Sequence, residues 1–137
     1  MTRVSWDKYY MDITWAASKR STCPRLAVGA IIVKDNKIIS TGFNGSLHGE
    51  GHCEDVGCLV VNGHCIRTIH AEMNSIFRAE QCLKGCTIYV THSCCIDCYK
   101  AIHQVGISKI IYDVEYKLID YPKILQLDWY PEIVKLT

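Results

Sequence analysis

The first half of the chain carries apolar residues at two different spacings. Residues 5–18 begin with a serine that can cap a helix and then repeat apolar side chains at helical intervals. Residues 28–33 form a short apolar run, and residues 37–43 follow as a returning strand after Asp35 and Asn36, a pair typical of hairpin turns. The pattern predicts a core-facing helix followed by a β-hairpin.

A second helix is expected after residue 68. Thr68 can cap it, and His70, Met73, Asn74 and Phe77 recur at helical spacing. We therefore expect these four side chains to share one face of the helix and to point inward toward the sheet.

The remaining elements are shorter. Residues 87–90 and 109–112 are apolar runs typical of strands, and residues 95–104 between them have the pattern of a helix. Residues 119–127 have a weak helical pattern, and a proline limits any last strand to residues 132–136. This order of elements predicts an α/β protein with three layers, α/β/α, around a central mixed sheet of about five strands.

Length and composition favour one globular domain over residues 1–137. With 49% hydrophobic and 21% charged residues the chain can bury a core, and no apolar run approaches the ~18 residues of a membrane span. We expect no secretory signal, and nine cysteines that are reduced thiols or metal ligands in the cytoplasm. A formal charge of +1 argues against long nucleic acid as a partner and leaves small nucleotides open.

One histidine and two cysteines have the spacing of a catalytic zinc site. His70, Cys95 and Cys98 would supply three ligands, which leaves the fourth tetrahedral position open for water. Glu72 lies two residues from His70, where its carboxylate is placed to move a proton of that water rather than to bind the metal. The alternative, a zinc finger or ribbon, needs four protein ligands, and no second cysteine or histidine falls three to five residues after His70.

These residues resemble the signature H-x-E…P-C-x-x-C of the zinc-dependent nucleobase deaminases. The departure is Cys94, which stands where the family has proline; we assign the first cysteine ligand to Cys95 because Cys95 and Cys98 keep the chelating spacing. Residues 42–45, Gly-Phe-Asn-Gly, resemble the G-Y-N-G motif of deoxycytidylate deaminases. The resemblance extends over about residues 18–116 and implies the cytidine deaminase-like fold.

The resemblance further implies a hydrolase that converts dCMP to dUMP, for thymidylate synthesis, and releases ammonia. Glu72 would pass a proton to the pyrimidine N3 and then to the leaving amine. The backbone of Ala71 and the carbonyl of Ser93 would hold the edge of the base, and Asn44 would contact the sugar.

Other candidate substrate contacts are less specific. Tyr112 and Tyr116 could line the base or the sugar, and could equally belong to the core or an interface. Four basic residues near the site in sequence are candidates for phosphate contact: Lys19, Arg20, Arg25 and Arg67. Each could equally be a solvated surface residue, so the sequence does not set the number of phosphates.

Residues 46–67 form a long segment rich in metal-binding side chains, and loops of this length are usually functional. These side chains are His48, His52, Cys53, Cys58, His64 and Cys65, with Cys23 upstream. Some deoxycytidylate deaminases carry a second, structural zinc, and the resemblance places its ligands at Cys23, Cys53 and His64, with Cys58 or else Cys65 as the fourth. The alternative is a set of reduced cysteines and surface histidines.

The C-terminal half is unusually apolar, which is typical of subunit contacts. Its apolar residues include Ile110, Ile111, Leu118, Ile119, Ile124, Leu125, Leu127 and Trp129. The resemblance implies a homo-oligomer, hexamer or dimer, that dCTP activates and dTTP inhibits, with Mg2+ accompanying a triphosphate effector.

Two other classes of function stay open on the sequence. One is a deaminase of the same fold that acts on another cytosine nucleotide, including dCTP, on a nucleoside or on tRNA adenosine. The other is a non-enzymatic zinc-binding module in which the metal only holds the fold.

Overall fold

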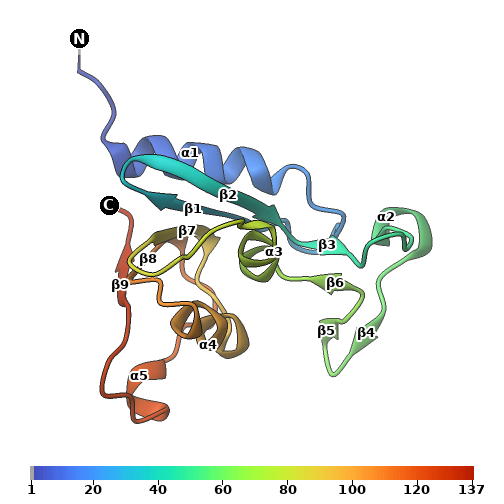
Figure 1. The fold of residues 1–137 in the computed structure, drawn as a ribbon. Coiled ribbons are helices and arrows are strands. Elements are labelled where there is room, and N and C mark those ends of the chain that lie inside the picture. The colour runs from blue at the N-terminus through green and yellow to red at the C-terminus, as the bar shows by residue number, and fades with distance from the viewer. Residues whose placement is uncertain (1) are drawn as a thin grey trace.

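A five-stranded sheet forms the centre of the protein, described by a computed structural model over residues 2–137 (Figure 1). The helices are α1 Trp6–Ser18, α2 Cys53–Val56, α3 Ala71–Arg78, α4 Ile96–Gln104 and α5 Tyr121–Ile124. The strands are β1 Gly29–Lys34, β2 Lys37–Phe43, β3 Gly45–Ser46, β4 Val60–Val61, β5 His64–Cys65, β6 Thr68–Ile69, β7 Thr87–His92, β8 Lys109–Val114 and β9 Glu132–Lys135.

The strand order of the central sheet is β2-β1-β7-β8-β9. Strand β1 is antiparallel to both β2 and β7, whereas β8 is parallel to both β7 and β9. A parallel pair needs a crossover connection, and α4 supplies it between β7 and β8. The predicted mixed sheet of five strands is confirmed.

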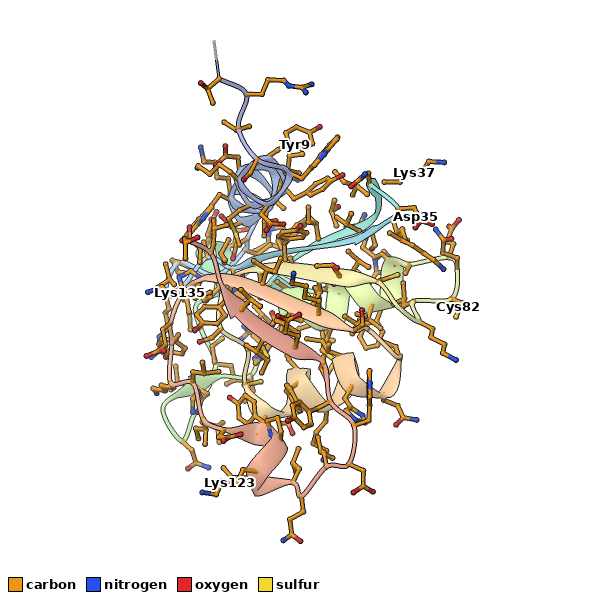
Figure 2. All side chains as sticks on the ribbon, turned by 90° about the vertical axis from the view of Figure 1, so that its left-hand side faces the viewer. Tyr9, Asp35, Lys37, Cys82, Lys123 and Lys135 are labelled. Carbon is orange, nitrogen blue, oxygen red and sulfur yellow. The ribbon has the colours of Figure 1, made fainter. Side chains whose placement is uncertain are left out.

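Helices cover both faces of the sheet, as the three-layer prediction requires (Figure 1). On one face, α1 packs so that Tyr10 meets Ile31 and Tyr89 of the sheet. On the other face lie α3 and α4. From the side, Tyr9 of α1 and Lys123 of α5 lie on opposite sides of the sheet (Figure 2).

The first two predicted elements are confirmed. Ser5 Oγ accepts a hydrogen bond from the Lys8 N–H at 3.1 Å and caps α1. Asp35 and Asn36 have φ values of 51° and 59°, the left-handed conformation that a two-residue hairpin turn of this kind requires at both positions. The turn joins β1 to β2.

Two glycines let helices approach the sheet closely. A Cβ atom at Gly29 would lie 2.1 Å from Thr14 O of α1, and one at Gly42 would lie 2.5 Å from Ala71 O at the start of α3. Neither separation is sterically possible, because the clashing partner is backbone. The approach at Gly42 places the first turn of α3 directly against β2.

The predicted start of α3 is wrong. Thr68 does not cap the helix, because it belongs to β6 and pairs with Ser46 of β3. His70 takes the N-cap position instead. The helix therefore begins two residues later than its polar cap signal indicates.

The predicted inward face of α3 is wrong in part, because Met73 packs against the core but Phe77 does not. The buried face carries Ala71, Glu72 and Ser75, whereas Phe77 is 68% exposed. Ser75 Oγ donates to Glu72 O at 2.7 Å, and Ser40 Oγ of β2 donates to Ser75 O at 2.6 Å. Hydrogen bonds of this kind make buried polar side chains tolerable. Because two of the three buried residues of α3 are polar, this face cannot be recognised in the sequence as a repeat of apolar residues.

The long segment between β2 and α3 folds into small pieces of regular structure. It contains the two-residue strand β3, the helix α2 and the hairpin of β4 and β5, before β6 pairs back onto β3. This insertion projects from one end of the sheet (Figure 1).

The C-terminal helix is shorter than predicted. It covers four residues instead of residues 119–127, because Gln126 with φ 53° has left the helical conformation. Strand β9 lies inside the predicted range 132–136. None of the helices within residues 2–137 combines the length and the apolar character that crossing a membrane requires.

The apolar surplus of the C-terminal half is smaller than predicted. Ile110 and Ile111 of β8 are 1% and 2% exposed and form core contacts on the two faces of the sheet. Ile119, Ile124 and Trp129 remain at the surface, each between 51% and 54% exposed. Of the apolar residues predicted for subunit contact, these three are the ones that stay exposed.

Candidate metal centre and its pocket

The three predicted ligands lie at the starts of two helices on the same face of the sheet. His70 is the N-cap of α3, Cys95 is the N-cap of α4, and Cys98 follows in the first turn of α4. Neither His70 nor Cys95 makes a side-chain capping hydrogen bond. Both side chains are therefore free to bind a ligand.

The distances between the ligand atoms fit one tetrahedral zinc ion. His70 Nδ1 lies 3.3 Å from Cys98 Sγ and 3.5 Å from Cys95 Sγ, and all three atoms lie within 4.8 Å of one another. With ordinary Zn–N and Zn–S bonds, tetrahedral geometry places nitrogen and sulfur about 3.6 Å apart. The residues present thus suit a zinc site with three protein ligands.

The charge state of Cys95 also suits metal binding. A hydrogen bond from Cys98 and a second from His70 lower the pKa of Cys95 to about 4, despite its partial burial. In return, the contact with Cys95 raises the pKa of His70. Cys95 is therefore a thiolate at neutral pH, and the thiolate is the form that binds metals.

Glu72 lies beside these ligands without joining them. It is 4% exposed and lines the same pocket, but the grouped ligand atoms are those of His70, Cys95 and Cys98. Burial raises the pKa of the Glu72 carboxyl, and its hydrogen bond to its own backbone and the nearby His70 oppose this only in part. A carboxyl shifted toward neutral pH suits proton transfer.

A cavity of about 450 Å³ opens over the metal site, within the usual range for small-molecule sites. Of the predicted substrate contacts, Asn44, Ala71 and Ser93 line it. Tyr112 does not, and this prediction is wrong, because the side chain is 6% exposed and packs in the core. Tyr116, the alternative considered from the sequence, does line the cavity.

Asn44 also has a structural role that the sequence did not indicate. Its Oδ1 accepts from the Val28 N–H at 2.9 Å, and its Nδ2 donates to Leu26 O at 2.7 Å. These bonds hold the segment that forms one wall of the cavity, since both Leu26 and Val28 line it. An asparagine amide has two hydrogens, so one N–H remains for a ligand.

Ser93 is fixed by the last residue of β8 and by the segment that follows it. Its N–H donates to Val114 O at 2.9 Å, its Oγ donates to Tyr116 O at 2.9 Å, and it accepts from the Tyr116 N–H at 2.6 Å. Within residues 2–137 no donor reaches the Ser93 carbonyl. That carbonyl is therefore available to accept a hydrogen bond from a bound molecule.

The cavity has two basic residues in its lining, Arg25 and Lys117. Arg25 was among the sequence candidates, whereas Lys19, Arg20 and Arg67 lie outside the lining. Lys117 was missed, because nothing in the sequence links it to a motif; its Nζ lies 5.3 Å from the centre of the Tyr116 ring. His92, Ile96 and Tyr121 also line the cavity.

A second group of ligand atoms lies in the insertion between β2 and α3. The sulfur atoms of Cys23, Cys53 and Cys58 lie within 4.8 Å of one another, and Cys53 Sγ lies 3.7 Å from Cys65 Sγ. Two thiolates on one tetrahedral zinc lie about 3.8 Å apart, and a disulfide would need ~2.05 Å. The structure does not bring His64 into this group, although it is the neighbour of Cys65.

Two of these thiols, Cys53 and Cys65, have pKa values shifted in opposite directions. Burial and hydrogen bonds with the neighbouring cysteines raise the pKa of Cys53 to about 12. Burial also acts on Cys65, but backbone hydrogen bonds from Arg67 and Leu59 outweigh it and lower the pKa of Cys65 to about 7. All nine cysteines of the chain are free thiols.

Comparison with known sequences finds similar proteins, two of which are named deoxycytidylate deaminase. ComE operon protein 2 of Bacillus subtilis is 50% identical over 127 residues, which cover 88% of this chain and 66% of that protein. Deoxycytidylate deaminase of Schizosaccharomyces pombe is 33% identical over 85% of this chain, which spans only 39% of the yeast protein. The deoxycytidylate deaminase of Mycobacterium phage D29 is 33% identical and matches over 99% of its length.

Comparison with solved structures gives the same fold. The dCMP deaminase of cyanophage S-TIM5, in complex with dCMP and dUMP, superposes with a TM-score of 0.83 and 31% identity over 99% of this chain and 100% of the other. A tRNA:A34 deaminase superposes with a TM-score of 0.63 at 16% identity, which shows a shared fold alone.

The family described as "Cytidine and deoxycytidylate deaminase zinc-binding region" matches residues 4–114. This range contains His70, Glu72, Cys95 and Cys98 together with every strand of the central sheet except β9. The resemblance noted from the sequence and the cytidine deaminase-like fold are thereby confirmed. The chain belongs to the zinc-binding cytidine and deoxycytidylate deaminase family.

Proposed function

We propose that this protein hydrolyses dCMP to dUMP and ammonia and so supplies dUMP for thymidylate synthesis. The observation that carries the proposal is the convergence of three ligand atoms at zinc spacing, beside a buried carboxyl, on one cavity. Relatives named deoxycytidylate deaminase, and a structural neighbour whose complex contains both dCMP and dUMP, support this choice of substrate.

The zinc ligands, Glu72 and Ser93 have different roles in the proposed reaction. Zinc held by His70, Cys95 and Cys98 would supply a water with a pKa of about 7, reactive at neutral pH. Glu72 accepts one proton of the attacking water and delivers it to N3 of the pyrimidine while the oxygen bonds to C4. It then takes the second proton from the C4 hydroxyl and delivers it to the amine, which leaves as ammonia as C4 becomes a carbonyl. Ser93 presents its free carbonyl to the exocyclic amine of the base.

The basic lining favours a nucleotide over a nucleoside. Arg25 and Lys117 both line the cavity, and a monophosphate carries up to two negative charges that they can pair with. The overall charge of +1 gives no extended basic surface for a polynucleotide. The nine free thiols suit a reducing, cytoplasmic setting.

Ammonia release measured with a panel of substrates tests this function. We expect turnover with dCMP and much lower values of kcat/KM with cytidine, which lacks the phosphate, and with an RNA hairpin containing adenosine. dCTP, which has the same base and two further phosphates, tests whether the cavity selects a monophosphate. Release from the hairpin or from cytidine at the rate of dCMP would contradict the assignment, and a zinc-loaded protein inactive on all four would indicate a non-enzymatic module.

The Glu72→Gln variant tests the proton-transfer role. The amide keeps the size of the side chain but cannot accept the proton, so we expect kcat to fall by at least ~10²-fold while the zinc content stays that of the wild type. Asp97→Asn is the matched control, because Asp97 is an exposed acid next to the same ligands; it should retain activity. Loss of zinc in parallel with activity in Glu72→Gln would instead identify Glu72 as a ligand.

A second, structural zinc is proposed at Cys23, Cys53, Cys58 and Cys65. The spacing of the sulfur atoms supports it, and four protein ligands are typical of structural zinc sites. The fourth ligand proposed here is Cys65, which lies 3.7 Å from Cys53, rather than His64. The site would hold the insertion, whose strands and helix are each only two to four residues long.

Metal analysis of single variants tests this site. We expect about two zinc ions per chain in the wild type and about one in both Cys53→Ser and Cys65→Ser, with a lower Tm, because structural zinc contributes folding energy directly. His64→Ala and Cys82→Ser should keep both ions; Cys82 is exposed and is not among the grouped ligand residues. One ion per chain in the wild type would remove the second site, and loss of an ion in His64→Ala would restore His64 as a ligand.

We further propose that the protein is a homo-oligomer, dimer or hexamer, whose activity responds to dCTP and dTTP. Exposed apolar side chains of the C-terminal segment support subunit contact: Ile119, Ile124, Trp129 and Tyr130. The regulation rests on the resemblance to deoxycytidylate deaminases. A triphosphate effector would bring Mg2+ with it.

Steady-state rates against dCMP concentration test the regulation. An effector shifts an equilibrium only through different affinities for two states. We expect dCTP with Mg2+ to convert a sigmoidal curve toward a hyperbola and dTTP to do the reverse, in a protein whose light-scattering mass is a multiple of 15.5 kDa. A monomer with a hyperbolic curve that neither triphosphate moves would contradict the regulation and leave the zinc chemistry untouched.

A further inference from the structure

Cys94 lies at a position where the family signature has a residue of restricted backbone conformation. It directly precedes the ligand Cys95, where the family signature has proline. A proline ring fixes φ near −65° and so restricts the backbone that leads into the metal ligand. The thiol side chain of Cys94 imposes no such restriction, so in this chain the backbone before Cys95 must be fixed by contacts from elsewhere.

Tyr121 supplies such a contact. Its hydroxyl donates to the Cys94 carbonyl at 2.8 Å in a buried setting, and the two residues are 2% and 4% exposed. The same ring packs on Tyr99, with 5.0 Å between the ring centres. Because Tyr99 directly follows Cys98, one side chain touches the residue before the first cysteine ligand and the residue after the second.

The position of Tyr121 is itself well determined. It is the first residue of α5, whose N-cap Asp120 accepts from the Lys123 N–H at 3.2 Å. The Tyr121 N–H donates to Ile119 O, and its carbonyl accepts from the Leu125 N–H, both at 2.9 Å. The phenol group therefore projects from a short but capped helix.

The end of β8 and the segment after it hold the turn that precedes the cysteine ligands through hydrogen bonds. Ser93 is bound through its N–H to Val114 and through its Oγ to the backbone of Tyr116, and the next residue, Cys94, is bound by Tyr121. Tyr121 lies beyond residues 4–114, where the family match ends. The bonds from Tyr116 and Tyr121 to the turn before the cysteine ligands thus come from a part of the chain outside the matched region.

We propose that Tyr121 is a positioning residue for the catalytic zinc site, and that its bond to the Cys94 carbonyl replaces the restriction that proline provides in the family signature. It holds Cys95 and Cys98 at the separation that suits the metal. The inference rests on the proposed zinc enzyme, since it concerns the geometry of the same ligands.

The Tyr121→Phe variant removes the hydroxyl and keeps the ring on Tyr99. We expect the zinc affinity of the catalytic site to weaken by about tenfold, the lower end for loss of a group that orients a ligand, and kcat at saturating zinc to fall while KM stays unchanged. Native mass spectrometry in buffers of decreasing free zinc measures the affinity. The wild-type protein should lose its two zinc ions in separate steps as free zinc decreases. The His70→Ala variant lacks a ligand of the catalytic site, so the step that is missing in this variant is the one that belongs to the catalytic zinc.

Tyr99→Phe is the matched control. The Tyr99 hydroxyl is buried with no hydrogen-bond partner in the described part of the chain. Tyr99→Phe therefore removes a hydroxyl from the adjacent ring, as Tyr121→Phe does, but removes no hydrogen bond. We expect unchanged zinc affinity in this variant. If Tyr121→Phe also keeps the affinity of the wild type, or loses only thermal stability, the proposal is overturned.

A second substitution makes the test independent of general destabilisation. Within residues 2–137 the Cys94 N–H donates to no other residue, so proline at this position costs no hydrogen bond to a neighbour. In the double variant Cys94→Pro, Tyr121→Phe the ring of proline should restore most of the lost zinc affinity. A double variant as weak as Tyr121→Phe alone would contradict the replacement of one restriction by the other.

The results that would contradict the role of Tyr121 differ from those that would contradict the proposed function. A wild-type protein that holds zinc at His70 and deaminates dCMP, with Tyr121→Phe and Tyr99→Phe indistinguishable from it, defeats only the role of Tyr121. A wild-type protein whose zinc content does not change on substitution of His70 defeats the proposed function itself.

Discussion

The metal site depends on two helices of one layer beginning at the same point. Zinc accepts ligands only within a narrow range of separations, so His70 at the start of α3 and Cys95 at the start of α4 must be placed to within a fraction of an ångström. Gly42 allows α3 to lie directly on β2, and the parallel pair β7 and β8 places α4 beside it on the same face. The sheet order therefore brings the starts of both helices, and with them the three ligands, to the same point.

This arrangement requires polar groups to be buried where a helix would normally present apolar ones. The inner face of α3 carries Glu72 and Ser75, and each buried polar group without a partner would cost roughly 1–3 kcal/mol. The buried hydroxyls of Ser75 and Ser40 are satisfied because they donate to the carbonyls of Glu72 and Ser75. Glu72 remains the one acid on that face with a pKa raised by burial, so the packing that positions the helix also tunes its reactive side chain.

The sequence predicted the parts of the molecule that follow local rules. The capped helix α1, the hairpin at Asp35 and Asn36 and the Cys95 and Cys98 spacing are each determined by a few neighbouring residues. Predictions from the sequence failed where contacts between segments far apart in the chain determine the position of a side chain. Tyr112 is in the core because β8 is covered on that face, and Lys117 lines the cavity only because the segment after β8 returns to the turn at Ser93.

Asn44 illustrates how a motif residue can be required for more than one reason. Its backbone N–H donates to Val28 O, its carbonyl accepts from Thr22 and Ser21, and its side chain both accepts and donates within the same few residues. Aspartate could not donate to Leu26 O, and glutamine would place its amide one methylene too far. Asparagine at this position is therefore dictated by the shape of the cavity wall. In this chain the hydrogen bonds of Asn44 account for how that wall is built and leave the identity of the sugar or base undetermined.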